Sequence, residues 1–158
     1  MAVEQRDSAL RQRVETIGLV VRTSAEEAMS QKQVVPVRIA VAEDEPDIRK
    51  TFVRLLELMG HEVVFSVSNG AELLEQMLDG QVDVVFVDLD MPVMDGLAAA
   101  EEVERKGIPV ILVSGHPDSE RVVLDHEPVV ARLSKPASLD AVQRAIEQAV
   151  AGRRSVPR

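Results

Sequence analysis

The feature that most constrains this chain is a regular alternation of short apolar runs with longer amphipathic stretches from residue 37 onwards. The apolar runs have the length and composition of buried strands and lie at 37–41, 62–67, 82–87, 108–113 and 129–133. Amphipathic stretches with helical spacing follow them at 46–59, 71–78, 96–106, 118–124 and 139–150. Because alternating strands and helices form parallel sheets with right-handed crossovers, we expect an α/β fold. The sequence therefore predicts a five-stranded, doubly wound parallel sheet built from five βα repeats.

Individual residues indicate where some of these helices begin and end. Pro46 suits the first turn of a helix, and Gly60 is typical of the left-handed residue just past a helix end. Asp95 directly precedes the 96–106 stretch, so we expect it to cap that helix by accepting a backbone N–H. His61 follows a glycine that ends a helix and is expected on a surface loop.

The charge distribution predicts three segments. The formal net charge is −9, and residues 1–34 contribute nothing to it because they hold five basic and five acidic residues. We expect a helical extension at 1–34, a globular domain at 35–151 and a short basic tail at 152–158. A narrow apolar stripe including Leu10, Val14, Ile17 and Val21 follows a heptad-like spacing in the extension. It suits a helix that forms a homodimer and one that folds back on the domain equally well.

Composition removes several classes of protein. The chain has no cysteine, which excludes disulfides, thiolate metal sites and a cysteine nucleophile. No apolar run reaches the ~18 residues of a membrane span, and no signal peptide is visible, so we expect a cytoplasmic protein without membrane contact. Aromatic residues make up 2% of the chain, and its negative charge repels phosphate, so we expect no nucleic-acid partner.

Polar side chains stand where four of the predicted strands end. In α/β sheets, ligands bind at the carboxyl ends of the strands. The residues at these ends are Glu43, Asp44, Asp88, Asp90, Ser114 and Lys135, the last followed by Pro136. Clustered carboxylates repel one another unless a cation neutralises them, and an oxygen-only set suits Mg²⁺. An aspartate held at such a site can act as a nucleophile and form an acyl phosphate.

The same residues carry a resemblance to a known family. Glu43-Asp44, the run Asp88-Leu-Asp-Met-Pro-Val-Met-Asp95-Gly96, Ser114-Gly115 and Lys135-Pro136 look like the receiver domain of two-component response regulators. The resemblance covers about residues 36–151, and the run from Asp88 to Gly96 is its most specific part. It implies a flavodoxin-like receiver fold.

The resemblance also implies a role for each matched residue. Asp88 is expected to accept a phosphoryl group from a histidine kinase or a His-containing phosphotransfer protein. Glu43, Asp44, Asp88 and the backbone carbonyl of Asp90 are expected to bind Mg²⁺, with Glu43 acting through water. Lys135 is expected to pair with the phosphoryl group, and Ser114 is expected to move and hydrogen-bond it.

Asp90 and His116 each lie two residues beyond a matched residue. In receiver domains these positions border the phosphoryl group and influence its hydrolysis. We therefore expect the pair to tune the lifetime of phosphorylated Asp88. The competing interpretation is two exposed polar side chains.

Two departures from the family pattern concern the output of the signal. The family usually has Tyr or Phe three residues before the lysine, and this chain has Arg132 there. An unpaired guanidinium is costly to bury, so it cannot replace a buried ring, and we expect Arg132 to pair with a nearby carboxylate or an acidic partner surface. The stretch 117–128 also lacks the signature that commonly precedes the last strand, which predicts a short or mobile fourth helix.

Two other functions fit parts of the pattern. Asp88-Leu-Asp90 resembles the signature of haloacid-dehalogenase-type phosphatases, but their nucleophile follows the first strand and their acidic pair follows the lysine. A pseudo-receiver, a binding module without phosphorylation, is the other alternative, and the intact Asp88 and Lys135 argue against it. We expect a phosphoacceptor rather than an enzyme. No DNA-binding output domain is visible, so we expect a downstream protein partner.

Overall fold

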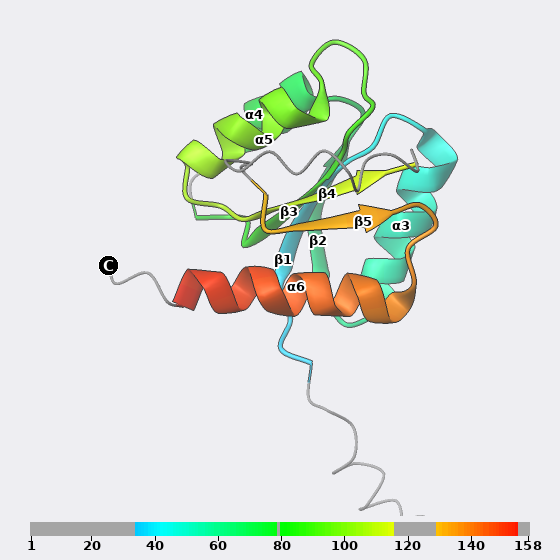
Figure 1. Ribbon diagram of the computed structural model, residues 1–158, viewed down its shortest axis with the longest axis vertical. Helices are drawn as coiled ribbons and strands as arrows, with labels where there is room; N and C mark the ends of the chain where they lie inside the picture. Colours follow the sequence, from blue (N-terminus) through cyan, green and yellow to red (C-terminus); the bar gives the residue numbers. More distant parts are fainter. Residues whose placement is uncertain (1–33, 79, 116–128, 155–158) are drawn as a thin grey trace, which may run out of the picture. The chain divides into compact units, whose positions relative to one another are not determined.

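The computed structural model describes residues 34–78, 80–115 and 129–154, which form one parallel five-stranded sheet flanked by helices (Figure 1). The strands are β1 (Arg38–Ala42), β2 (Glu62–Val67), β3 (Val84–Asp88), β4 (Val110–Ser114) and β5 (Ala131–Ser134). The helices are α3 (Pro46–Leu58), α4 (Gly70–Gln76), α5 (Gly96–Arg105) and α6 (Leu139–Arg154). The strand order is β2-β1-β3-β4-β5, and every neighbouring pair is parallel. The predicted doubly wound sheet is confirmed.

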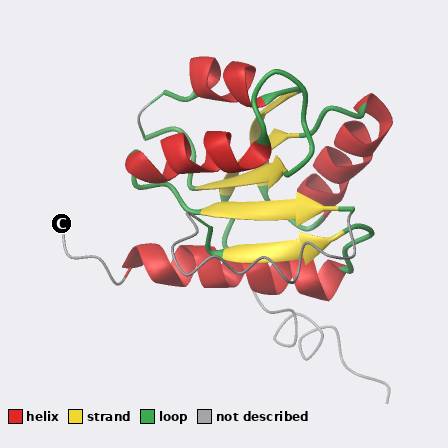
Figure 2. Cartoon of the chain, turned by 45° about the horizontal axis from the view of Figure 1, so that its top comes forward, coloured by secondary structure: helices red, strands yellow, loops and turns green. Residues whose placement is uncertain are grey.

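Alternate residues of each strand supply two separate apolar cores, because successive side chains point to opposite faces of a sheet. On one face, Val85 and Val87 of β3 pack with side chains of α4 and α5. On the other face, Val84 and Phe86 pack with side chains of α3 and α6. Figure 2 shows the sheet between these two helical layers. All five residues of β3 are buried, as expected for a strand covered on both faces.

The capping predictions for two helices are confirmed. Pro46 stands at the start of α3, where its missing N–H costs nothing because the first N–H groups of a helix have no intrahelical partner. The Asp95 carboxylate accepts the backbone N–H of Ala98 and caps α5. Gly60 has φ 92°, the left-handed conformation expected of it.

Three strands begin two residues later than predicted. The apolar residues Val82 and Ile108 are buried but precede the ladder. Asp83, next to Val82, binds the backbone N–H of Arg38 with its side chain. Pro109, next to Ile108, has no N–H to donate to a neighbouring strand. The apolar run therefore marks what is buried, and hydrogen bonding decides where the strand begins.

Two local predictions are wrong. His61 is 6% exposed rather than on the surface, and its Nδ1 accepts the backbone N–H of Val37 at 3.4 Å. The last helix runs through Gly152 to Arg154 instead of ending at residue 150. The Arg153 guanidinium donates to the carboxylate and the carbonyl of Asp83, which anchors this additional turn to the sheet.

Two predicted elements lie outside the described residues: the helix at 118–124 and nearly all of the extension at 1–34. Within the described ranges, no helix has the length and apolarity needed to cross a membrane.

Candidate functional site

The site lies at the carboxyl ends of β1 and β3, which are neighbours in the sheet. The chain leaves β1 toward β2 on one side and later returns to place β3 on the other side. This is the topological switch point at which α/β sheets bind ligands. Asp88 is the last residue of β3, and Glu43 and Asp44 directly follow β1. The fold therefore brings together acids that are separated by more than forty positions in the sequence.

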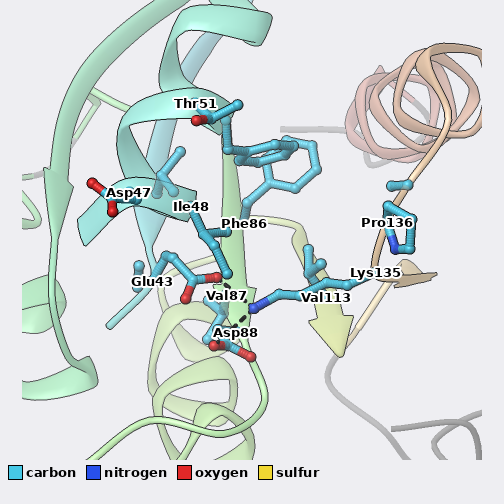
Figure 3. A pocket seen from close by; sticks show the side chains of 14 residues that line it. Glu43, Asp47, Ile48, Thr51, Phe86, Val87, Asp88, Val113, Lys135 and Pro136 are labelled. Atoms are coloured by element: carbon cyan, nitrogen blue, oxygen red, sulfur yellow. Dashed lines mark hydrogen bonds and ion pairs between the residues drawn. The ribbon is translucent and has the colours of Figure 1, made fainter. Parts of the chain in front are cut away.

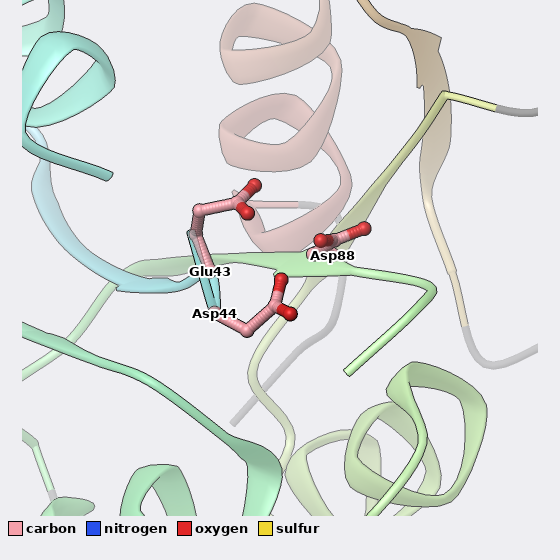
Figure 4. A group of neighbouring side chains, drawn as sticks. All are labelled: Glu43, Asp44 and Asp88. Carbon is pink, nitrogen blue, oxygen red and sulfur yellow. The ribbon is translucent and has the colours of Figure 1, made fainter. Parts of the chain in front are cut away.

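Three carboxylates form a tight group at this switch point (Figure 4). One oxygen from each of Glu43, Asp44 and Asp88 lies within 4.8 Å of the others. Glu43 and Asp88 are each 5% exposed, whereas Asp44 is exposed. Three negative charges this close repel one another strongly in a partly buried site. The set contains only hard oxygen donors and has an exposed side that leaves room for water, so it fits Mg²⁺.

Lys135 compensates part of this negative charge. Its Nζ lies 2.6 Å from Glu43 Oε2 and 3.1 Å from Asp88 Oδ2 (Figure 3). Burial disfavours the charged ammonium, but the hydrogen bonds to Glu43 and Asp88 outweigh it and raise the pKa of Lys135. Burial also raises the pKa of Glu43, against the opposing effect of the hydrogen bond from Lys135. The lysine is thus held as a cation between two buried carboxylates.

Backbone groups fix the direction of both buried carboxylates. The N–H of Glu45 donates to Glu43 Oε1 at 3.1 Å, and the N–H of Asp90 donates to Asp88 Oδ1 at 3.2 Å. The Arg49 guanidinium of α3 donates to the backbone carbonyl of Glu43 at 2.7 Å. The acids are therefore held by the loops that follow β1 and β3, with support from the first turns of α3.

The loop after Asp88 folds back so tightly that only glycine fits at position 96. A Cβ built on Gly96 would lie 2.3 Å from the backbone oxygen of Asp88 and 2.8 Å from Cα of Leu89. The N–H of Gly96 donates to the carbonyl of Leu89 at 3.1 Å and closes the loop. In the same loop Val93 has φ 71°, an unusual conformation for a β-branched residue. The glycine of the sequence motif is thus explained by a close approach to the backbone of Asp88.

The remaining predicted site residues lie at the end of β4, within β5 or outside the described part. Ser114 is 4% exposed at the end of β4, and its carbonyl accepts the N–H of Lys135 at 2.8 Å. Arg132 is half-buried in β5 and pairs in register with Leu112 of β4. Its neighbours Ala131 and Leu133 pack in the core beneath α3 and α6, so Arg132 belongs to the opposite face of the sheet. His116 lies outside the described residues.

The sequence analysis missed two parts of the site. It did not find the contact between Arg49 and the Glu43 carbonyl. An arginine in the first turn of a helix, shortly after an acidic pair, could have predicted this contact. It also missed an apolar cavity of about 530 Å³ beside the acids, because no local pattern encodes an unfilled space between distant elements.

Known proteins share the sequence pattern of this domain. The sequence profile of the response regulator receiver domain matches residues 39–147. The transcriptional regulatory protein PdtaR of Mycobacterium tuberculosis is 33% identical over 124 residues, which cover 77% of this chain and 60% of that protein. The transcriptional regulatory protein GlrR of Escherichia coli is 32% identical over 120 residues, which cover 73% of this chain and 26% of that protein. The chain thus spans only part of the length of these relatives.

Solved structures show the same architecture. A response regulator receiver domain protein from Clostridium thermocellum aligns with a TM-score of 0.68 and 28% identity, covering 75% of this chain and 97% of that structure. The response regulator TrrA from Thermotoga maritima, solved in complex with Mg²⁺-BeF, aligns with a TM-score of 0.63 and 28% identity. That alignment covers 72% of this chain and 98% of the TrrA structure.

Proposed function

This chain belongs to the response regulator receiver domain family, and on that basis we propose that it accepts a phosphoryl group on Asp88. The donor is a phosphohistidine of a histidine kinase or of a His-containing phosphotransfer protein. The observation that carries the proposal is the position of Asp88, a buried carboxylate at the end of a central strand beside Lys135, Glu43 and Asp44.

The transfer needs a nucleophile that is both held in place and negatively charged. A carboxylate oxygen of Asp88 attacks the phosphorus of the donor, the phosphorus–oxygen bond forms, and the phosphorus–nitrogen bond of the phosphohistidine breaks. The imidazole nitrogen keeps the bonding electron pair, and the product on this chain is an acyl phosphate. Lys135 Nζ already lies 3.1 Å from Asp88 Oδ2, so its ammonium can donate hydrogen bonds to the phosphoryl oxygens once they are attached. Ser114, at the end of the neighbouring strand, supplies a hydroxyl to the same group.

The acidic group is proposed to hold Mg²⁺ through Asp44, Asp88 and the backbone carbonyl of Asp90, with Glu43 contributing through water. When bound, Mg²⁺ would neutralise the negative charge that develops on the phosphoryl oxygens. The chain's own groups position the acids, because Lys135 offsets part of the repulsion between the carboxylates and backbone hydrogen bonds hold Glu43 and Asp88 in place. The Mg²⁺ complex of the Thermotoga maritima relative supports this proposal.

We propose that Asp90 and His116 set the lifetime of the acyl phosphate by influencing the approach of water. Asp90 is exposed and lies two residues beyond Asp88. Replacing both residues by alanine should change the rate of phosphate loss after the donor is removed. An unchanged rate would show that they are exposed polar residues without this role.

The signal is proposed to leave the domain through contact with a protein partner, because a phosphoryl group acts by changing local charge and packing. Arg132 is the residue we assign to this step, in place of the usual aromatic residue. Exchange of Arg132 for alanine should weaken partner binding, and unchanged affinity in both phosphorylation states would refute the assignment. We propose that the receiver spans residues 35–151, between an extension at 1–34 and a tail at 152–158, whose first residues continue α6 to Arg154. Sedimentation of the full chain against residues 35–158 tests whether the extension forms a homodimer.

The central experiment is incubation with acetyl phosphate, with and without Mg²⁺, followed by intact mass measurement. We expect one phosphoryl adduct that requires Mg²⁺ and is lost in Asp88→Asn. Asp140→Asn, an exposed acid in the first turn of α6, is the matched control and should keep the adduct. Steady release of phosphate without an adduct would instead indicate a phosphatase of the haloacid-dehalogenase type. No adduct and no turnover would indicate a pseudo-receiver.

A further inference from the structure

An apolar cavity of about 530 Å³ opens beside the acidic group and extends beneath α3. Its floor is formed by the ends of the central strands, including Phe86 and Val113. Ile48 and Thr51 of α3 line one side, and Pro136 of the turn between β5 and α6 lines the other (Figure 3). The volume lies within the range of about 300–1,000 Å³ typical of small-molecule sites.

The cavity exists because side chains that line it are small or pack against each other. Thr51 and Ala137 line it with small side chains that leave the space unfilled. The two largest side chains, Phe52 and Phe86, pack against each other edge to face with centroids 5.0 Å apart. This pair leaves an apolar wall suited to a ring, because aromatic groups favour edge-to-face and offset contacts.

Most of the cavity lining is apolar, and its few polar groups gather where it meets the acidic group. Glu43 and Asp88 lie there with Lys135 between them and together carry net negative charge, whereas the Asp47 carboxylate points away from them (Figure 3). A carboxylate has about four acceptor positions. The described residues supply two donors to Glu43, from Lys135 and the Glu45 N–H, and two to Asp88, from Lys135 and the Asp90 N–H. Both buried carboxylates therefore keep acceptor capacity for a further cationic donor.

We propose that this cavity is a binding site for a small organic cation with an aromatic or branched apolar body. The body occupies the space between α3 and the Pro136 turn, against Phe52 and Phe86. The cationic head, an amidinium or ammonium group, donates hydrogen bonds to Glu43 and Asp88. Charge selects the ligand, because an anionic head would be repelled by the carboxylates of Glu43 and Asp88, and a neutral head would not offset the negative charge that Lys135 leaves uncompensated.

The position of the head makes binding of this ligand and of a divalent metal ion mutually exclusive. Both would occupy the acceptor positions of Glu43 and Asp88, so the two compete for one site. A ligand of this class would therefore lower the rate of phosphorylation at Asp88 without touching the phosphodonor. This consequence rests on the proposed function, whereas binding itself does not.

The test uses the ¹⁵N-labelled chain of residues 1–158 and three probes of matched shape: benzamidine, neutral benzamide and anionic benzoate. Benzamidine should shift the amide resonances of Phe52, Phe86 and Lys135, with a dissociation constant at least about tenfold lower than that of benzamide. Benzoate should cause no shift at these residues. Because the two compete, the apparent dissociation constant of benzamidine should rise linearly with the free Mg²⁺ concentration.

Cavity-filling variants locate the site. Thr51→Leu in α3 and Ala137→Leu in the turn before α6 should each abolish the benzamidine shifts, whereas Ala151→Leu, an exposed position of α6 outside the cavity, should retain them. Equal binding of benzamidine and benzamide, or shifts that survive both filling variants, would overturn the proposal. Benzamidine binding that Mg²⁺ does not affect would overturn the placement of the head. If acetyl phosphate gives no adduct but benzamidine binds as described, the proposed function fails and the ligand site stands.

Discussion

Exchange of Gly96 for alanine tests the explanation of the loop that carries the acceptor. An added Cβ would lie 2.3 Å from the backbone oxygen of Asp88, and side-chain carbons essentially never approach below 3.0 Å, so the two must separate by about 0.7 Å. Both nearest neighbours belong to the backbone, so no flexible side chain can yield. The strain therefore falls on the segment Asp88–Leu89 itself.

The expected loss of stability can be assembled from these contacts. Overpacking at a tight position costs about 1–3 kcal/mol. Weakening the 3.1 Å hydrogen bond from the Gly96 N–H to Leu89 adds about 1 kcal/mol. Alanine recovers about 0.5–1 kcal/mol through its better helix propensity. We expect a net loss of about 1–3.5 kcal/mol and a lower extent of phosphorylation, because the Asp88 backbone is displaced.

Urea unfolding followed by far-ultraviolet circular dichroism measures this loss, since the chain has no tryptophan or tyrosine for fluorescence. Gly152→Ala in α6 is the control, because its added Cβ meets nothing within 4 Å. That variant should be unchanged or gain up to about 1 kcal/mol. If Gly96→Ala unfolds within about 0.5 kcal/mol of the parent protein and accepts phosphate normally, the close-approach argument is wrong.

Three further predictions concern other contacts. The hydrogen bond from Arg38 lowers the pKa of Asp83 in the folded state. Ionised Asp83 therefore stabilises the fold above the unfolded pKa of about 3.9, and this contribution is lost as the pH falls through the lower folded pKa. Asp83→Asn should therefore cost about 1 kcal/mol at pH 7, and this cost should shrink as the pH falls below about 3.9. An equal cost at every pH in urea titrations would contradict the prediction. Val93→Gly should raise stability by about 1 kcal/mol, because Val93 has φ 71° and is 85% exposed, and a lower melting temperature would refute the assigned strain. Lys135→Met should lower the free energy of unfolding by about 2–4 kcal/mol, because it leaves the Glu43 and Asp88 carboxylates unpaired. Millimolar Mg²⁺ should restore part of this loss, and thermal unfolding that does not respond to Mg²⁺ would argue against the metal site.

Local patterns in the sequence were sufficient to predict the described helices and strands and several of the residues at which they begin or end. Pro46, Asp95 and Gly60 act through their own backbone or through an N–H three residues away, so their roles can be read without knowing the fold. The burial of β3 also follows from its continuous apolar run. These features depend on sequence separations of a few residues.

Other features depend on partners far along the chain. His61 was expected on the surface because it follows a turn glycine, but β1 passes beside it and its ring accepts the Val37 N–H. The last helix continues through Gly152 because Arg153 reaches Asp83, seventy positions earlier. In both cases a long-range contact outweighs a local preference that is worth about 1 kcal/mol at most.

The sequence alone determined that acids, a hydroxyl and a lysine stand at strand ends, because strand periodicity and turn chemistry are local properties. Only the tertiary structure decided which of them meet. The order β2-β1-β3-β4-β5 places Glu43 beside Asp88 and brings Lys135, ninety-two residues from Glu43, to 2.6 Å from its carboxylate. It also leaves the space between α3 and the Pro136 turn unfilled. Convergence and empty volume are properties of how distant elements pack, and no short stretch of sequence contains them.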